Sequence, residues 1–325
     1  MDELSRHFIN RFQGGFPLLE QPFASIATEL DTDQANLISM VQSLLADGIL
    51  SRFGPLYDAV SMGGGLTLAA LCVPEKDFDR VAQQVNSLPE VAHNYRRQHA
   101  LNMWFVIATE STEAIQQAID KIESLTGLPV YNFPKLREFY VGLWLQLDEQ
   151  GSVNTRSFEV PKRETGISLD ELDRSIIEAT QGGLPLLPEP FSEVADRCGS
   201  DTVSVINRLR RMIDNGVIRR IGAVPNHYRL GLKSNGMSVW DVTDDRIEAL
   251  GEKIGKLDFV SHCYHRPRHL PMWSYNLFAM VHGHNSDEVD SKIKKIAGIL
   301  GKDCKTHEVL FSSAILKKTG LRLVA

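Results

Sequence analysis

Apolar residues recur along the chain with two spacings, and each spacing predicts one type of element. At 111–125 the apolar positions Ile115, Ala118, Ile119 and Ile122 lie three or four residues apart or adjacent, so they would share one face of a helix that ends at Gly127. Short runs rich in β-branched and aromatic residues predict strands instead. The expected strands lie at 66–73, 91–97, 102–109, 130–147, 236–240, 260–266, 276–281 and 305–316, and the expected helices at 75–88, 111–125, 246–257 and 287–300. In each half of the chain the order is β-α-β-β-α-β, which predicts a ferredoxin-like α+β domain.

A group of three helices is predicted ahead of each of these domains. In the second half, Ser168-Leu169-Asp170-Glu171 has the spacing of a capping box, which predicts a helix start. A short helix is expected at about 191–197, and a third at 202–214 would be closed by Asn215-Gly216 as a left-handed cap. Residues 219–224 then predict a short β-wing. Three helices followed by a wing form a winged helix-turn-helix.

The whole arrangement occurs twice. The segment Gln13-Gly14-Gly15-Phe16-Pro17-Leu18-Leu19 returns at 181–187 with one substitution, at a constant offset of 168 residues. A period of this length indicates a duplicated domain pair, since solenoid repeats are only about 20–50 residues long. We therefore expect an α+β tandem duplication. It would contain winged helix-turn-helix domains at 1–60 and 168–230, ferredoxin-like domains at 61–150 and 231–325, and a polar linker at 151–167.

Composition and charge narrow the classes of protein that remain. No run of about 18 apolar residues and no signal-peptide pattern occurs, so a cytoplasmic protein without membrane contact is expected. The four cysteines form no C-x-x-C pair, which disfavours disulfides and a zinc site, and no metal site is expected. Residues 1–150 carry 10 Lys and Arg against 19 Asp and Glu, and the remainder carries 25 against 22. Positive charge is thus local, whereas a protein that grips phosphate backbones usually has a broad basic face.

The candidate chemistry lies in a pattern, His-x-Tyr-x-Arg, that both copies contain. On a strand, alternate side chains point to the same face, so the three residues of each copy would share one face. An imidazole, a phenol and a guanidinium make a poor hydrophobic core but a plausible acid/base and carboxylate-binding wall. The two sets are His93, Tyr95 and Arg97 in the first copy and His262, Tyr264 and Arg266 in the second.

Several segments resemble known families. The run Asn207-Arg208-Leu209-Arg210-Arg211-Met212-Ile213-Asp214-Asn215-Gly216-Val217-Ile218 resembles the recognition helix and wing of the leucine-responsive regulators, the Lrp/AsnC-like family, which has this domain layout. The Gly-Gly-Phe/Leu-Pro-Leu segments, the segment 262–267 and the segment 275–283 are similar to the siroheme decarboxylases, enzymes that share the fold. This second resemblance covers nearly the whole chain. It indicates a fused two-subunit siroheme decarboxylase of heme d1 biosynthesis.

The resemblance implies a reaction and a substrate. Two acetate side chains of siroheme would lose carbon dioxide and become methyl groups, giving 12,18-didecarboxysiroheme. No further cofactor is implied, because the conjugated macrocycle can take up the electron pair that carbon dioxide leaves behind. An octa-carboxylate substrate needs several cations in one cleft, and arginine is suited because its planar fork binds a carboxylate through two N–H groups. The candidate arginines are Arg96, Arg97, Arg219, Arg220, Arg266 and Arg268.

Histidine and tyrosine are the expected proton donors. We expect His262 with Tyr264 to act in the second copy and His93 with Tyr95 in the first, with His99 and His282 lining the cleft. The alternative that such histidines are hydrogen-bonded structural residues stays open. The copies differ at the end of the motif, where Arg97-Gln98-His99 of the first copy corresponds to Arg266-Pro267-Arg268 of the second. The second copy also has about five extra residues around Pro267 and Pro271, which predict an active-site loop. We therefore predict that the second copy catalyses while the first completes the cleft.

The second function that the fold suggests is a ligand-responsive, DNA-binding transcription regulator. Between Gln13 and Ser51 there is no Lys or Arg and there are five acidic residues, so a recognition helix there would repel phosphate. DNA binding is therefore not expected. A homodimer is expected, because ferredoxin-like domains of this kind pair their sheets between chains. The resemblance also suggests homologous decarboxylase subunits as partners.

Overall fold

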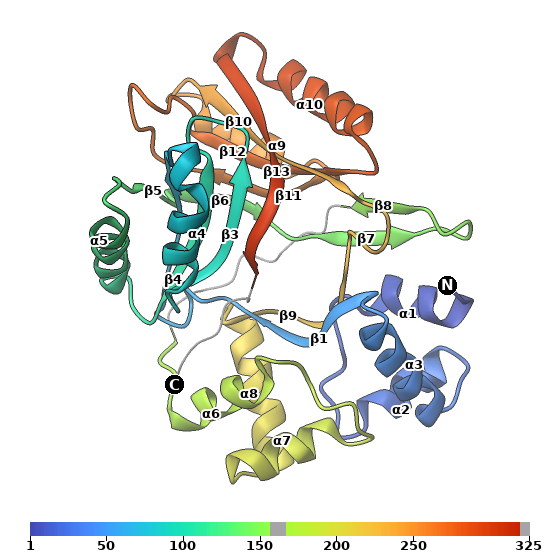
Figure 1. The fold of residues 1–325 in the computed structure, drawn as a ribbon. Helices are drawn as coiled ribbons and strands as arrows, with labels where there is room; N and C mark the ends of the chain where they lie inside the picture. Colours follow the sequence, from blue (N-terminus) through green and yellow to red (C-terminus); the bar gives the residue numbers. More distant parts are fainter. Residues whose placement is uncertain (157–166, 319–325) are drawn as a thin grey trace.

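The computed structural model describes residues 1–156 and 167–318. Its helix-turn-helix parts lie together on one side of the molecule, and its sheets lie on the other (Figure 1). The first copy contributes α1 (Glu3–Phe12), α2 (Pro22–Glu29) and α3 (Gln34–Ala46), and the second contributes α6 (Glu171–Thr180), α7 (Pro190–Cys198) and α8 (Thr202–Asp214). The prediction of three helices per copy is thus confirmed. Buried residues of all six helices belong to one continuous apolar core, so the two helical parts are packed together.

The helix starts follow local hydrogen-bonding chemistry. Asp2, Asp33, Asp170 and Asp201 each accept a hydrogen bond from a backbone N–H in the first turn of α1, α3, α6 and α8. The capping box of α6 was predicted two residues too early, because its cap is Asp170, closed reciprocally by Asp173, and not Ser168. At the end of α8, Gly216 has a φ of 75°, as the predicted left-handed cap requires.

The strand predicted as a wing is paired across the two copies. β9 (Ile218–Pro225) runs antiparallel to β1 (Leu50–Tyr57), the corresponding strand of the first copy. This two-stranded ribbon lies between the helices and the sheets (Figure 1).

Each copy continues as the predicted β-α-β-β-α-β unit. In the first, β2 (Gly65–Leu71), β3 (Val91–Arg97), β4 (Met103–Thr109) and β5 (Tyr131–Pro134) alternate with α4 (Phe78–Asn86) and α5 (Ala114–Thr126), with a 3₁₀ turn at Glu75–Asp77. In the second, β10 (Ser234–Val242), β11 (Val260–His265), β12 (Leu277–Gly283) and β13 (Cys304–Lys318) alternate with α9 (Ile247–Gly255) and α10 (Ser286–Leu300), with a 3₁₀ turn at Gly301–Asp303. The α+β fold class predicted from the sequence is confirmed.

The last strand of each copy crosses to the other copy. β13 pairs first with β10 of its own copy and then, from Ser312, with β3 of the first copy. In the same way β5 pairs with β2, and the next strand, β6 (Arg137–Val141), pairs with β11 of the second copy. The nine strands therefore form one sheet in the order β5-β2-β4-β3-β13-β10-β12-β11-β6. The pairing that led us to expect a homodimer is thus made within one chain, and a homodimer stays a prediction.

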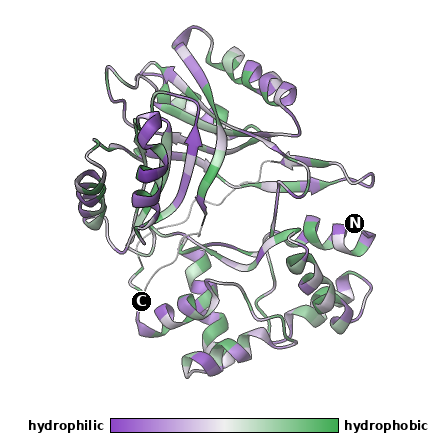
Figure 2. Cartoon of the chain, in the orientation of Figure 1, coloured by the Kyte–Doolittle hydropathy of each residue, from purple (hydrophilic) through white to green (hydrophobic). Residues whose placement is uncertain are grey.

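The two faces of this sheet bury different apolar sets. One core lies under α4 and α5 and another under α9 and α10, so the helices cover the outer faces (Figure 1). The amphipathic pattern of these helices is visible as hydrophilic outer surfaces in Figure 2, most clearly on α4. A third core joins inner residues of both copies and includes Trp104, Phe133, Trp273 and Phe278. The inner faces of the two copies therefore meet each other.

The region between the copies only partly resembles the expected linker. β8 (Val153–Arg156) falls within the predicted linker and pairs with β7 (Trp144–Leu147), while residues 157–166 lie outside the described residues. The domain boundaries at residues 60, 150, 167 and 230 stay predictions. None of the helices in the described ranges is long and apolar enough to cross a membrane.

Candidate functional site

An open cavity of about 360 Å³ lies where the inner sheet faces of the two copies separate. Its volume is in the range of small-molecule sites. The cavity has no carboxylate in its wall, since none of the described lining residues is an aspartate or a glutamate. Its charged and titratable side chains are arginines, a lysine, histidines and tyrosines. They are Tyr95, Arg97, Lys135, His227, Tyr228, His262, Tyr264, Arg266 and His282. Such a cavity favours a ligand that carries several negative charges.

The tyrosine and the arginine of the repeated motif lie in the cavity wall in both copies. The guanidinium of Arg266 stacks over the ring of Tyr264 at 4.7 Å, and that of Arg97 lies 5.7 Å from the ring of Tyr95. These pairs lie two residues apart on strands β3 and β11 or just beyond, which explains why they share a face. All four residues line this one cavity, and their role in a functional site stays a prediction.

The guanidinium groups of Arg97 and Arg266 use only some of their N–H groups in hydrogen bonds within the protein. Each donates one hydrogen bond to a backbone carbonyl of the other copy, Arg97 to Leu310 on β13 and Arg266 to Phe133 on β5. Among the described residues, nothing accepts from the buried Nε of Arg97 or of Arg266. Burial lowers the pKa of each guanidinium to about 10, so both are charged at neutral pH. Both arginines line the cavity, where their charged guanidinium groups could bind a carboxylate of a ligand.

His262 is linked to His282 through a serine. The Oγ of Ser261 lies 2.8 Å from Nδ1 of His262 and 2.6 Å from Nε2 of His282. Nδ1 of His282 in turn contacts the side-chain oxygen of Asn235. Burial lowers the pKa of His262 to about 4 and lowers that of His282 well below its usual value. Both imidazoles are therefore neutral at pH 7 when no ligand is present.

A charged network borders the cavity beside Tyr264. Glu138 on β6 accepts hydrogen bonds from Arg219 and from Lys135, at 3.0 and 2.9 Å. Burial alone would raise the pKa of Glu138, but the hydrogen bonds and charges of these two cations outweigh it and lower the pKa to about 2. Burial raises the pKa of the Tyr264 phenol, which is thus protonated at neutral pH. Lys135 reaches the cavity while Arg219 is held behind it.

These shifts predict how stability depends on pH. The free energy of unfolding should fall as the pH decreases from about 6.5 to about 4, because the unfolded chain binds protons at His262 and His282 that the folded chain does not. Glu138, whose folded pKa is also lowered, adds its own loss only below about pH 4.5. Thermal unfolding followed across this range measures the effect. His262→Gln should make the dependence shallower; an equally steep dependence in that variant contradicts the assignment.

Four residues assigned to the site, His93, His99, Arg220 and Arg268, lie outside this cavity, and so do the candidate arginines Arg96 and Arg219. His99 accepts a hydrogen bond from the N–H of Leu101 and packs edge-on against Trp273. Arg220 donates to the carbonyls of Gln13 and Ala223 and lies over the ring of Trp144. The other two of the four are Arg268 and His93. All four assignments rested on sequence spacing, which does not show how loops and neighbouring strands pack.

Arg268 belongs to the inserted loop, which closes the far end of the space between the sheets. Its guanidinium binds Asp241 and Asp244 and the carbonyls of Val242 and Ser274, so it is fully engaged. In the same loop Trp273 is buried against Trp104. Among the predicted loop residues 267–271, none lines the cavity. The expectation of an active-site loop thus differs from the structure, where Leu270 of the insertion is 72% exposed and Trp273, which follows it, packs into the core.

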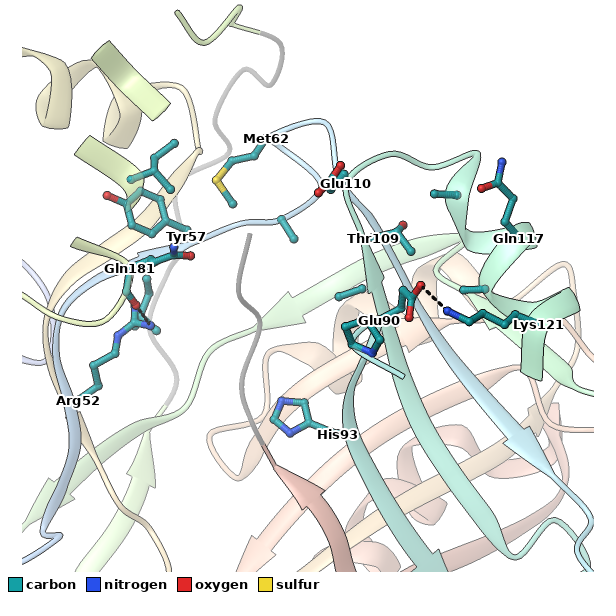
Figure 3. A pocket seen from close by; sticks show the side chains of 17 residues that line it. Arg52, Tyr57, Met62, Glu90, His93, Thr109, Glu110, Gln117, Lys121 and Gln181 are labelled. Carbon is teal, nitrogen blue, oxygen red and sulfur yellow. Dashed lines mark hydrogen bonds and ion pairs between the residues drawn. The ribbon is translucent and has the colours of Figure 1, made fainter. Parts of the chain in front are cut away.

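His93 faces a different cavity. This second cavity, of about 650 Å³, lies between β1, α5 and α6 and is lined by Glu90, Glu110 and Lys121 as well as His93 (Figure 3). Its acidic residues make it less suited to a polycarboxylate. His93 still stacks on Tyr95, with ring centroids 6.2 Å apart, but the two rings do not line the same cavity. The two copies of the motif are therefore placed differently.

The arginines of the second recognition helix are engaged by the protein itself. Arg208 binds Asp170 and Asp173, and Arg211 binds Asp173 and the carbonyl of Ser168. Arg210 contacts Asn207 and, at 3.5 Å, the carbonyl of Leu18. The charges of Arg208 and Arg211 are thus offset before any phosphate approaches, whereas the contacts of Arg210 are with neutral groups.

Comparison with known proteins identifies both domain types. Residues 5–50 and 173–219 match the siroheme decarboxylase NirDL-like HTH domain, and residues 63–140 and 229–317 match the AsnC-like ligand binding domain. The siroheme decarboxylase of Hydrogenobacter thermophilus is 33% identical over 95% of this chain and 92% of its own length. The siroheme decarboxylase NirH subunit of Pseudomonas aeruginosa is 57% identical over 152 residues, which are 47% of this chain and 89% of that protein.

A solved structure covers almost the whole chain. The crystal structure of the siroheme decarboxylase NirDL superposes with a TM-score of 0.75 and 28% identity, over 99% of this chain and 94% of that one. A second crystal structure, of the siroheme decarboxylase NirDL in co-complex with an iron-uroporphyrin III analogue, superposes with a TM-score of 0.71 and 29% identity, over 98% of this chain and 93% of that one. The family matches, the full-length relative and this structural agreement lead to one conclusion. The chain belongs to the siroheme decarboxylase family.

Proposed function

We propose that this chain removes carbon dioxide from two acetate side chains of siroheme, giving 12,18-didecarboxysiroheme for heme d1 biosynthesis, and that it does so in the cavity between the sheets. The observation that carries this assignment is the lining of the cavity. Among the described residues that line it, three are cations, Arg97, Lys135 and Arg266, and none is acidic. Siroheme carries eight carboxylates, so it matches such a lining in charge. The co-complex of NirDL with an iron-uroporphyrin III analogue, also a polycarboxylate tetrapyrrole, supports the choice of substrate class.

Binding is assigned to Arg97, Arg266 and Lys135. The two arginines are held by packing and by one backbone hydrogen bond each, so their unused N–H groups point in fixed directions. A carboxylate placed there would receive charge-assisted hydrogen bonds in a partly desolvated site. The apolar lining residues Leu68, Val106 and Met280 offer a surface for the flat macrocycle.

The chemical step breaks the bond between the methylene carbon and the carboxylate carbon. Carbon dioxide leaves, the electron pair remains on the methylene carbon and is delocalised into the macrocycle, and one proton must then be added to that carbon. The protein's part is to orient the scissile carboxylate, to exclude water and to supply the proton. His262 and Tyr264 are the donors that we assign, because both line the cavity in the second copy.

The charge of the substrate changes the pKa of His262. In the absence of ligand, burial and the nearby Arg219, Arg266 and Lys135 disfavour a proton on His262, and only Glu138 favours one. A bound polycarboxylate compensates those cations and so shifts the pKa of His262 upward, which favours uptake of a proton by the imidazole. Tyr264 stays protonated throughout and can donate a hydrogen bond to the departing carboxylate or to the developing charge.

The two copies are assigned unequal roles. His262 and His282 line the cavity in the second copy, whereas His93 lines another cavity in the first. We therefore assign proton transfer to the second copy, while Tyr95 and Arg97 of the first copy complete the binding surface. This keeps the predicted division of labour and moves His93 out of the catalytic set.

The remaining features of the proposal concern cofactors, partners and location. No cofactor beyond the iron tetrapyrrole substrate is needed, since the macrocycle itself takes up the charge. Shorter relatives named as NirH and NirG subunits suggest homologous subunits as partners. Formation of a homodimer and a cytoplasmic location are further parts of the proposal.

The function is tested by mass spectrometry. Purified protein mixed with siroheme under anaerobic conditions should convert the ligand to species that have lost one and then two carbon dioxide molecules. A control with heat-denatured protein measures spontaneous loss. Ligand that keeps its mass, together with sequence-specific binding of a DNA duplex, would instead support the ligand-responsive regulator.

A further inference from the structure

His262 stands at one end of a hydrogen-bond chain of four side chains. The chain runs from Asn235 to His282, from His282 to Ser261, and from Ser261 to His262, whose ring borders the cavity. Ser261 is 2% exposed and His282 is 4% exposed, so water has little access to the middle of the chain. A serine hydroxyl has a single proton, so it can donate to only one of the two imidazoles and must accept from the other.

The direction of the chain is set at Asn235. The side-chain NH₂ of Asn235 donates to the carbonyl of Leu232 at 3.4 Å, which leaves its oxygen toward His282. That oxygen can only accept, so Nδ1 of His282 carries the proton and Nε2 of this neutral ring is an acceptor. Ser261 therefore donates to His282 and accepts from Nδ1–H of His262.

The chain occurs only in the second copy. β3 and β11 each have an irregularity in register just before the histidine, so the backbone is bulged in both copies. At the positions that correspond to Asn235, Ser261 and His282, the first copy has Leu66, Ala92 and Ala108. The bulge is thus shared, but the hydroxyl and the second imidazole are not.

We propose that Ser261 is a positioning residue that holds His262 in the form with a proton on Nδ1, so that Nε2 is the atom that exchanges a proton with the substrate. The inference rests on the proposed function and makes the role of His262 specific. When His262 is protonated, Nδ1–H still donates to Ser261 and Nε2–H is available to the methylene carbon. After transfer of that proton, Nε2 has a lone pair and Nδ1 is unchanged. One proton moves, and the ring changes charge without changing tautomer.

The ring state can be observed directly by ¹⁵N NMR of the histidine side chains in the full chain. His262→Gln assigns the signals. Without ligand at neutral pH, His262 should show a protonated Nδ1 and an unprotonated Nε2, the reverse of the usual preference of free histidine. Ser261→Ala should shift His262 toward the Nε2-protonated form. A wild-type His262 with its proton on Nε2 overturns the proposal, whatever the activity of the protein.

Turnover supplies the second readout. Ser261→Ala should lower kcat by about 10- to 100-fold, as is typical when the partner that orients a functional histidine is removed, with KM little changed. Ser261→Thr, which keeps the hydroxyl, should recover most of the rate. Ser238→Ala removes another buried serine hydroxyl, on strand β10 two strands away in the sheet, and is the matched control, with wild-type kcat expected. A Ser261→Ala protein with wild-type kcat and an unchanged His262 tautomer overturns the inference.

Two variants of Asn235, at the other end of the hydrogen-bond chain, test the proposal without changing Ser261, whose substitution could disturb the fold. Asn235→Asp keeps an acceptor for Nδ1–H of His282 and should preserve the tautomer of His262, whereas Asn235→Leu, which restores the residue of the first copy, should lose it. Equal tautomers in the two variants contradict the proposed direction of the chain. If the wild-type protein leaves siroheme unchanged while the NMR result holds, the proposed function fails and the hydrogen-bond chain stands.

Discussion

Replacing His262 by glutamine should slow the release of carbon dioxide from siroheme by about 10²- to 10⁴-fold, the range lost when a general acid is removed. The reason is its placement, since its ring borders the cation-lined cavity and is hydrogen-bonded to Ser261. Affinity for siroheme should fall less than the rate, because glutamine keeps a polar group at the site and the cations Arg97, Arg266 and Lys135 are unchanged. Anaerobic single-turnover assays that follow product mass separate the two quantities.

The matched control is the same substitution at His93. It occupies the same motif position in the first copy but lines the other cavity, so His93→Gln should retain the rate within a few-fold (Figure 3). Melting temperatures of both variants verify that the fold is intact. Equal residual activity in the two variants would reject the proposed inequality of the copies.

The fold was accessible to sequence reasoning because its signals are local. The period of 168 residues gives the duplication, and the alternation of helices and strands gives the ferredoxin-like unit in each copy. The crossing of β6 and β13 to the opposite copy was not accessible in this way. A strand's own pattern shows which face is apolar, but not which edge it will pair with.

The site was predicted in part for the same reason. Tyr95, Arg97, Tyr264 and Arg266 share the cavity because alternation along one strand is a local rule. Lys135 reaches the cavity from the segment between β5 and β6, and it does so through pairing between copies that no spacing in the sequence encodes. It carried no signal of its own.

Two further misses arise from irregular backbone. Ser261 would face the helices in a regular strand, but the register shift between Val260 and His262 brings its hydroxyl to both imidazoles. Arg268 is the type of residue expected to bind a carboxylate of the substrate, yet the loop places its guanidinium against Asp241 and Asp244. Residue type indicated the chemistry in both cases, while the local backbone decided its target.

Replacing Arg97 or Arg266 by glutamine should weaken siroheme binding by roughly 10- to 150-fold each, which corresponds to ~1.5–3 kcal/mol for a hydrogen bond to a charged group. Each arginine is almost fully buried in the cavity wall, is charged at neutral pH and has an Nε without an acceptor among the described residues. Lysine at either position keeps the charge but loses the planar fork, so Arg97→Lys and Arg266→Lys should fall between the glutamine variants and the parent. Anaerobic titration followed by siroheme absorbance gives the affinities.

Arg268→Gln is the control for charge in general. It also removes one positive charge from the second copy, but from a guanidinium that is bound to Asp241 and Asp244 outside the cavity. Its affinity for siroheme should therefore equal that of the parent protein, while the affinities of the Arg97 and Arg266 variants fall. Since the lost contacts are electrostatic, raising the salt concentration should weaken binding to the parent more than binding to either glutamine variant. Equal losses in all three glutamine variants would mean that net charge, and not the geometry of this cavity, binds the substrate.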